Sequence, residues 1–382
     1  MVTRAPKDLR RLALAGGALL ALACSHTDPF TSPPYGATEP LDPTPPVRLT
    51  LNPGPDREAS WLADGSGILY SAQQVGRPDR DVCLAELPPL GGSQRRLICD
   101  LSPLGGDTVN AIEYPVAGGD GRLAFLKAGN PNNITRPVVE AVTVAPGLDP
   151  RSGAEVVRVP YTVSGEPTHN TVSHLHWLSP TRLTFVGSVR TYRNVCMLPC
   201  VRQDTIQSGL KAGVLDLAAP GSPPALLPGT EFASGVSPGP SEGEIYFTLG
   251  GDTRVYRRVL ATGETNVIHD FGAAGIARDV HVAGNKLTAI VGGRAHFIVD
   301  PELGPIQVDS GGFVHVVNLG SGSDAALDGP GLFRHPALAP TGDRVVAEGF
   351  PLIIVDVPVD AETVRPDTTV ARDGDLYLFT AP

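Results

Sequence analysis

The chain has 382 residues, of which 44 are glycine and 38 are proline, while only 18% are charged. Residues 1–23 hold four of the 30 basic and one of the 40 acidic residues, so the rest has 26 basic against 39 acidic residues, a net charge of −13. This balance argues against binding to nucleic acid or to an anionic lipid surface.

Residues 1–23 predict a signal peptide. Arg4, Lys7 and Arg10 give a positive start, and residues 12–23 are an unbroken run of Leu, Ala and Gly. Such a run suits a signal-peptide core and is too short to span a bilayer. The small residue followed by Cys24 resembles the bacterial lipobox, which implies that Cys24 is lipidated and becomes the N-terminus. An ordinary cleaved signal peptide is the alternative.

Residues 24–46 predict a disordered tether. Seven prolines stand among Ser, Thr, Asp and Glu in residues 25–46, a composition that cannot bury a core. Ser25, rather than Asp, follows Cys24. By resemblance to Gram-negative lipoproteins, this implies anchoring to the outer membrane, on its periplasmic or surface face, if the source is Gram-negative.

The five cysteines are consistent with export. If Cys24 is acylated, four remain, an even number that suits an oxidising compartment. Cys83 and Cys99 lie symmetrically about a turn, which predicts a disulfide across a hairpin. Cys196 and Cys200 are expected to close a small loop by a second disulfide. Half of a metal site is the alternative for this second pair.

Residues 47–382 predict an all-β domain. Short apolar runs alternate with Gly, Pro, Asp and Ser clusters, and no stretch of ten residues after the signal has helical periodicity. A unit of strand, tight turn and strand recurs at intervals on the order of 50 residues, as in repeat folds. Its clearest copies contain Trp61, Trp177 and His335, and weaker copies contain Tyr114, Val236 and Val282.

Residues 61–65, Trp-Leu-Ala-Asp-Gly, followed by Ile68-Leu69-Tyr70, resemble the W-S-P-D-G…I-Y repeat of TolB-like propellers. The resemblance implies one six-bladed β-propeller over residues 47–382. The Asp-Gly pair makes the turn between two strands, and alternating apolar residues fill the space between blades. Because the sixth blade ends at residues 376–379 without an outer strand, we expect the strand at residues 47–51 to complete it.

The innermost strands of a propeller line its central channel. Alignment of the six copies places four side chains at one mouth of the channel: Glu58, His174, Asp279 and His335. It places three more deeper: Glu113, His176 and His281. Converging carboxylates and imidazoles predict a site for a divalent metal ion or a polar ligand. The alternative is that these residues are polar because the channel is wet.

These observations favour a lipid-anchored binding or scaffolding module of the cell envelope, with no catalytic site identified. Its expected partner is an envelope protein or a small polar ligand, and its expected membrane contact is through the N-terminal lipid. The alternative is a lyase or hydrolase that acts on a polysaccharide or lactone with a metal at the channel. Fold alone does not decide between these functions.

Overall fold

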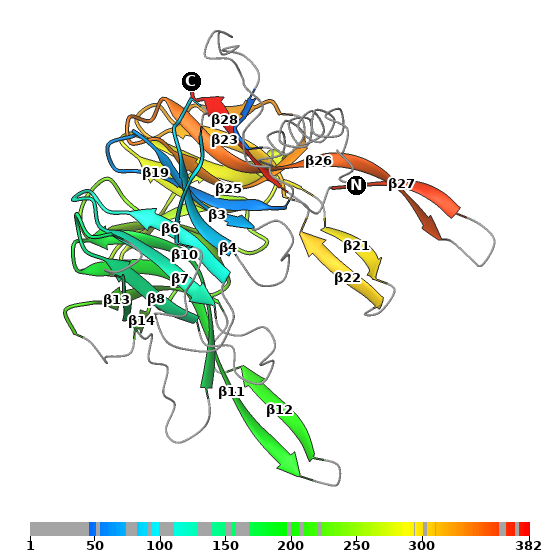
Figure 1. Ribbon diagram of the computed structural model, residues 1–382, viewed down its shortest axis with the longest axis horizontal. Helices are drawn as coiled ribbons and strands as arrows, with labels where there is room; N and C mark the ends of the chain where they lie inside the picture. The colour runs from blue at the N-terminus through cyan, green and yellow to red at the C-terminus, as the bar shows by residue number, and fades with distance from the viewer. Residues whose placement is uncertain are drawn as a thin grey trace, which may run out of the picture.

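The computed structural model shows six antiparallel sheets arranged around a central axis (Figure 1). The predicted all-β, six-bladed propeller is therefore confirmed. The predicted signal peptide, Cys24 and nearly all of the tether lie outside the described residues. The structure describes residues 46–50, 54–73, 82–90, 93–98, 111–128, 139–149, 154–157, 168–196, 200–206, 210–219, 224–293, 295–300, 304–309, 311–329, 331–358, 364–370 and 374–382.

In blades one to five the strands run in chain order from the axis outward, whereas in blade six the N-terminal strand is outermost. Blade one has β2 (Asp56–Trp61), β3 (Ile68–Gln73), β4 (Val82–Leu87) and β5 (Arg95–Ile98). Blade two has β6 (Ala111–Ala117), β7 (Leu123–Ala128), β8 (Val139–Val144) and β9 (Ala154–Val157). Blade three has β10 (Thr168–Ser179), β11 (Arg182–Cys196), β13 (Lys211–Asp216) and β14 (Ala225–Leu226), and β12 (Cys200–Ile206) pairs with β11.

Blade four has β15 (Ala233–Pro238), β16 (Glu244–Leu249), β17 (Arg254–Val259) and β18 (Thr265–Asp270), followed by the 3-10 helix η2 (Gly272–Ala274). Blade five has β19 (Ala277–Ala283), β20 (Lys286–Val291), β23 (Phe313–Asn318) and β24 (Asp324–Leu327), with the hairpin β21 (Ala295–Asp300) and β22 (Gly304–Asp309) inserted. Blade six has β25 (Gly331–Leu338), β26 (Arg344–Pro358), β28 (Asp375–Thr380) and β1 (Val47–Arg48), and β27 (Val364–Val370) pairs with β26.

The turn between the first two strands of blade one shows why the repeat needs its Asp-Gly pair. The Asp64 carboxylate accepts a hydrogen bond from the Ser66 backbone nitrogen at 2.9 Å. Gly65 then takes a φ of +73°, which a side chain would disfavour. The backbone nitrogen of Leu62 donates to the Gly67 carbonyl at 2.9 Å and closes the turn.

The hydrophobic core is divided into clusters that each join two neighbouring blades. One cluster, for example, packs Leu69 and Leu84 of blade one against Phe125 and Val142 of blade two. Equivalent clusters lie at the other five interfaces between blades. Each blade therefore buries its apolar residues against the next blade, as expected for a repeat fold that has no single core.

The N-terminal strand completes blade six, as predicted. β1 pairs antiparallel with β28, with Val47 opposite Leu378. The guanidinium of Arg48 lies 2.5 Å from the buried carboxylate of Asp375, and the Leu376 backbone nitrogen donates to the Thr50 hydroxyl at 2.9 Å. The ring of blades is thus closed by residues more than 300 positions apart.

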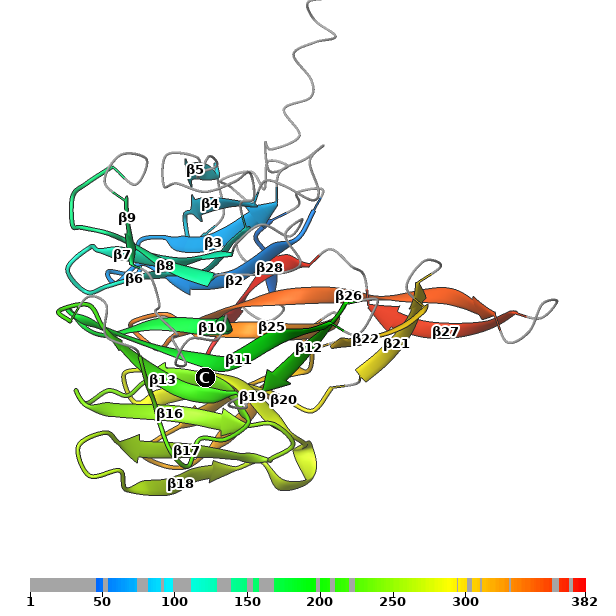
Figure 2. The same cartoon turned by 90° about the horizontal axis from the view of Figure 1, so that it is seen from below.

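Three hairpin extensions project from the same side of the propeller (Figure 2). They are formed by β11 and β12, by β21 and β22, and by β26 and β27. All three lie in the connection between the second and third strands of a blade, which places them on one face of the disc. We call this the hairpin face. No helix in the described part of the chain is long and apolar enough to cross a membrane.

The predicted disulfides stay predictions. Cys83 lies buried in β4, but Cys99 lies outside the described residues. Cys196 and Cys200 stand opposite each other in the register of β11 and β12, as a small closed loop requires.

Candidate functional site

The inner strands of five blades carry a β-bulge at the same position. The pairing of β2 with β3 shifts between Arg57 and Ser60, and equivalent shifts occur in blades two, three, five and six. A bulge inserts one residue and redirects its side chain. The residues at these bulges have φ values between +45° and +55°, a conformation that side chains disfavour and that often marks a functional site. We call them the bulge ring: Glu58, Tyr114, His174, Asp279 and His335.

Two residues further along each inner strand lies a second ring, which we call the deep ring. It lies further from the hairpin face and consists of Ser60, Val116, His176, His281 and Ala337. The two rings together line an axial pocket with a volume of about 40 Å³. Such a volume holds one ion or a few waters, since a single water needs roughly 10–15 Å³ on this measure. Blade four contributes no described residue to the lining of this pocket. Its inner strand has Gly235 here, because a Cβ atom at this position would lie only 2.7 Å from the Asp279 backbone nitrogen.

Asp279 is at the centre of the polar contacts in the bulge ring. One carboxylate oxygen lies 2.9 Å from Nε2 of His174, and the other accepts a hydrogen bond from the His335 backbone nitrogen at 3.2 Å. Burial alone would raise the pKa of Asp279, but the nearby His335 and the hydrogen bond to His174 lower it well below its ordinary value. Asp279 is therefore a buried carboxylate that stays ionised.

His335 is held between carboxylates. Its Nδ1 lies 3.0 Å from an oxygen of Glu348, which is 1% exposed in β26. Burial would lower the pKa of His335, but Asp279 and Glu348 raise it to about 9. The ring of His335 also lies near Tyr114, whose hydroxyl is 3.4 Å from Nε2. The imidazole thus has one nitrogen fixed by Glu348 and the other directed toward the axis.

Glu58 lies in the same pocket in a different protonation state. Its carboxylate accepts a hydrogen bond from the Tyr114 backbone nitrogen at 2.6 Å. Burial and the nearby Glu113 raise the pKa of Glu58 to about 8. At neutral pH this carboxyl group is mostly protonated, so it can donate a proton to a bound molecule.

The deep ring contains two uncharged imidazoles. The centroids of His176 and His281 lie 5.4 Å apart, and Nδ1 of His281 accepts a hydrogen bond from the Leu338 backbone nitrogen at 3.1 Å. Burial lowers the pKa of His281 to about 4. Burial and the neighbouring His281 lower the pKa of His176 well below its usual range. The bulge ring is therefore charged and the deep ring is neutral.

Three side chains of the bulge ring have the geometry of a metal site. One ligand atom each from His174, Asp279 and His335 can be chosen so that all lie within 4.8 Å of one another. The second imidazole nitrogen of each histidine already has a partner, Ser173 at 2.9 Å from His174 and Glu348 at 3.0 Å from His335. Such outer hydrogen bonds fix the ring orientation of metal-binding histidines. Two histidines and one carboxylate suit Zn²⁺, Fe²⁺ or Mn²⁺ and leave coordination positions open.

Six of the seven side chains predicted for the channel lie in the axial pocket, and Glu113 does not. The alignment of blade two was wrong by three residues, because it took Tyr114 as the counterpart of Trp61. The strand continues to Ala117 before its turn at Gly118, so Tyr114 occupies the bulge. Glu113 precedes Tyr114 in the strand. Burial raises the pKa of Glu113, although the nearby Arg57 opposes this shift.

Sequence reasoning missed Tyr114 and Glu348. The alignment placed Tyr114 at the position equivalent to Trp61, and the Pro115 that follows it was the available sign of an irregular strand. Glu348 follows Val345-Val346-Ala347 in β26, and a lone acid after an apolar run is a signal for a buried, partnered carboxylate.

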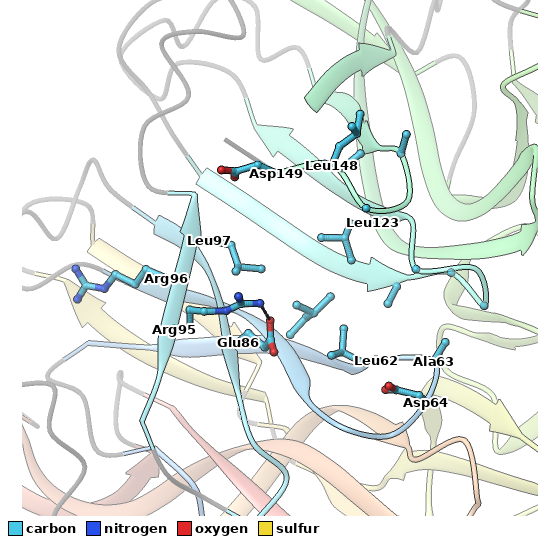
Figure 3. Close-up of a pocket in the computed structure, with 18 residues that line it drawn as sticks. Leu62, Ala63, Asp64, Glu86, Arg95, Arg96, Leu97, Leu123, Leu148 and Asp149 are labelled. Atoms are coloured by element: carbon cyan, nitrogen blue, oxygen red, sulfur yellow. Dashed lines mark hydrogen bonds and ion pairs between the residues drawn. The ribbon is translucent and has the colours of Figure 1, made fainter. Parts of the chain in front are cut away.

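A second, larger cavity lies between blades one and two, near the turns opposite the hairpin face (Figure 3). Its volume is about 880 Å³, and its lining includes Leu62, Leu97 and Leu123. Arg95 and Glu86 form an ion pair at 2.7 Å on its wall. The residues that line it include no histidine, so its chemistry differs from that of the axis.

No protein-family model matches this sequence, and no curated protein is similar to it. Solved structures are similar in fold. A gluconolactonase from Xanthomonas campestris has a TM-score of 0.52 and 12% identity over 92% of this chain and 100% of that one. TolB from Acinetobacter baumannii has a TM-score of 0.48 and 15% identity over 84% of this chain and 67% of that one. A luciferin-regenerating enzyme has a TM-score of 0.49 and 12% identity over 88% of this chain and 95% of that one. At such identities the likeness shows the propeller fold alone.

Proposed function

We propose that this chain is an exported, lipid-anchored β-propeller that binds a divalent transition-metal ion at its axis and a small polar ligand over it. The observation that supports the metal site most strongly is the arrangement of His174, Asp279 and His335. Their ligand atoms can lie within 4.8 Å of one another, and both histidines are oriented by hydrogen bonds on the far side of the ring.

The carboxylates of the pocket supply the negative charge that a cation needs, and binding would displace the Nε2 proton of His335, whose pKa is about 9. Asp279 is ionised, and Glu348 lies directly behind His335. The axial pocket has room for an ion but not for a large ligand, with a volume of about 40 Å³. With three protein ligands, an ion would keep open positions that face the hairpin side, where a water or a ligand oxygen can bind.

The experiment is a metal titration of the purified, chelator-treated chain, followed by calorimetry and elemental analysis. We expect about one Zn²⁺ or Mn²⁺ per chain, as in other sites with three protein ligands, and much weaker binding of Mg²⁺. His174→Ala and His335→Ala should each abolish tight binding. The matched control is His315→Ala, which removes a histidine that lies 2.9 Å from Asp324 in blade five, away from the axis.

A chain that stays free of metal after this titration contradicts the proposal. So does tight binding that survives in both axial variants, because the ion would then lie elsewhere.

A second candidate function is a metal-dependent lyase or hydrolase that acts on a polysaccharide or lactone. The raised pKa of Glu58 favours it, because a protonated carboxyl group beside the metal ligands can serve as a general acid. A bound ion would supply Lewis-acid polarisation of a substrate oxygen. Glu58→Gln should then remove turnover and leave metal affinity within about 3-fold of the wild type, since glutamine keeps the shape of the side chain. Turnover that is unchanged in this variant would exclude Glu58 as the acid.

The hairpin face supports a role in partner binding. Three hairpins stand on the same face as the mouth of the axial pocket, so an envelope protein that contacts them would cover the ligand. Loops and extensions on a rigid scaffold are common recognition elements. Removal of the β21 and β22 hairpin should weaken capture of such a partner and leave metal binding unchanged.

Cell-envelope localisation is part of the proposal and depends on Cys24. Labelling of growing cells with a radioactive fatty acid should mark the wild-type chain and not Cys24→Ser. Equal labelling of both chains would exclude Cys24 as the lipidated residue. Fractionation of the labelled cells would then test whether the chain reaches the outer membrane.

A further inference from the structure

A cavity of about 500 Å³ lies directly over the bulge ring, on the side of blades three to six. His174, Asp279 and His335 line both this cavity and the axial pocket, so the two spaces meet at the proposed metal ligands. A molecule in the cavity can therefore reach the open positions of an axial ion. A volume of this size suits a small organic molecule such as a single sugar.

Two arginines give the cavity a positive wall. Arg278 precedes Asp279 in β19 and Arg334 precedes His335 in β25, so both stand one residue before a bulge. The guanidinium of Arg278 donates to the carbonyls of Gly311 at 2.6 Å and Gly292 at 3.1 Å. These bonds fix Arg278 against blade five, where it contributes charge.

Arg334 differs from Arg278 in its surroundings. Its guanidinium carbon lies 4.4 Å from the centre of the Phe350 ring. Its buried Nε has no hydrogen-bond partner among the described residues, a feature that it shares with Arg257, Arg258 and Arg344. Among the described residues, no carboxylate lies within 4 Å of the Arg334 guanidinium, whereas Arg48, Arg95 and Arg257 all have one. A guanidinium that lines a cavity and has no carboxylate partner can pair with the carboxylate of a ligand.

We propose that Arg334 binds the carboxylate of a small, sugar-sized organic acid in this cavity, with another oxygen of the same molecule over the axial metal. This inference deepens the proposed function and rests on it. A stacked, planar guanidinium is pre-organised for a two-point contact with a carboxylate. The single fork of Arg334 matches the two oxygens of one carboxylate, and the Asp279 carboxylate, which lines the same cavity, disfavours a doubly charged phosphate.

The rest of the cavity wall suits the body of such a molecule. Ser173 and Ser234 line it beside Gly250 and Gly251, and Leu210 and Ile276 complete its rim. Hydroxyl and backbone groups can pair with the hydroxyls of a sugar, and the apolar side chains can pack against its ring.

The test is calorimetric titration of the zinc-loaded chain with three molecules that share one hexose body: glucuronate, glucose 6-phosphate and glucose. We expect glucuronate to bind and glucose to bind at least 10-fold more weakly, because glucose leaves Arg334 without a partner. Glucose that binds as tightly as glucuronate would overturn the inference. Tighter binding of glucose 6-phosphate than of glucuronate would show that Arg334 does not prefer a carboxylate. If glucuronate gives no heat of binding at millimolar concentration, the cavity is not a site for such an acid.

Three variants separate the role of Arg334 from a general effect on folding. Arg334→Gln should weaken glucuronate binding by about 10–100-fold, and Arg334→Lys should weaken it less, because it keeps the charge and loses the planar fork. The matched control is Arg344→Gln, since Arg344 also lies over an aromatic ring, that of Trp61 at 5.2 Å, but outside the cavity. Equal affinity in Arg334→Gln and the wild type would overturn the inference. If Arg334→Gln fails to fold, as judged by thermal melting, Arg334→Lys decides in the same assay.

Zinc binding measured in the same samples separates the two proposals. Arg334 is not a metal ligand, so all three variants should bind zinc as the wild type does. Zinc binding by the wild type without any glucuronate binding would overturn this inference alone. Absence of zinc binding by the wild type would instead contradict the proposed function.

Discussion

The bulge ring and the deep ring lie two residues apart on the same five inner strands, yet their electrostatics are opposite. His335 in the bulge ring lies beside Asp279 and Glu348, which raise its pKa to about 9. Among the described residues no carboxylate perturbs His281 in the deep ring, and burial lowers its pKa to about 4. Burial therefore keeps an imidazole neutral unless a carboxylate stands beside it, and at His335 these carboxylates come from blades five and six.

The difference also explains why we assign the metal to the bulge ring. A divalent cation needs negative charge as well as imidazole nitrogens, and Asp279 supplies it. The deep ring places His176 and His281 within 5.4 Å of each other, but the rest of that ring is Ser60, Val116 and Ala337. Two imidazoles without a carboxylate make a weaker site for a cation.

The largest expected effect comes from removing the carboxylate of the bulge ring. Asp279→Ala leaves the buried His335 and His174 without their shared partner, so the free energy of unfolding should fall by about 3 kcal/mol or more. Urea unfolding of the metal-free chain measures this. The matched control is Asp324→Ala, which removes a half-buried carboxylate near His315 and should cost about 1 kcal/mol or less. Equal losses in the free energy of unfolding would show that the carboxylate of the bulge ring contributes no more to stability than one at the periphery.

The pH dependence of stability should have opposite signs in the two rings. The folded-state pKa of His335 is about 9, above its unfolded value of 6.5, so its charge stabilises the fold fully below pH 6.5 and the contribution is lost as pH rises through 9. The folded-state pKa of His281 is about 4, so its contribution is lost as pH falls from 6.5 towards 4. Each effect should be on the order of 2 kcal/mol.

Urea unfolding of metal-free His335→Gln and His281→Gln between pH 4.5 and pH 9.5 checks these signs. The cost of His335→Gln should be greatest near pH 6 and smallest at the alkaline end. His281→Gln should become more stable relative to the wild type as pH falls. The same slope in both variants would remove the contrast between the rings.

A smaller effect is expected at neutral pH in the deep ring. His281→Ala leaves the Leu338 backbone nitrogen without its acceptor, which should cost about 1–2 kcal/mol. Zinc affinity should stay within about 3-fold of the wild type, because His281 is not in the proposed ligand set. A loss of zinc binding as large as that in His174→Ala would place the metal deeper than we propose.

The smallest effect is expected in the cavity between blades one and two. Arg95→Ala breaks an ion pair with Glu86 in which the arginine side chain is 71% exposed. Such pairs contribute little, so the free energy of unfolding should change by less than about 1 kcal/mol, and metal and glucuronate binding should be unchanged. A large effect on ligand binding would show that this cavity communicates with the axis.

The fold was predictable from the sequence because the repeat consists of turns and apolar patterns that short sequence segments determine. The tight turn at Asp64-Gly65, the apolar alternation of residues 68–70 and the terminal strand at Val47 each depend on neighbours in sequence or on ring closure. The bulges were not predictable, since a bulge depends on how one strand pairs with the next. That is why Glu113 was placed in the channel instead of Tyr114. His174, Asp279 and His335 were found because each lies three residues before an apolar position that aligned correctly.

The supporting residues needed the structure. Glu348 comes from the second strand of blade six and reaches His335 only through the pairing of β25 with β26. Arg334 was not singled out because its importance depends on what is absent around its guanidinium. The hairpin extensions have no repeat signature, and their common face follows from their shared place in three blades.

The most direct test of the axial metal site is an anomalous difference map from crystals of the zinc-loaded chain, measured at the zinc edge. We expect one strong peak on the propeller axis, about 2.0–2.2 Å from Nε2 of His174, Nε2 of His335 and a carboxylate oxygen of Asp279. A fully loaded crystal with no peak there, or with its peak between His176 and His281, would contradict the proposed site.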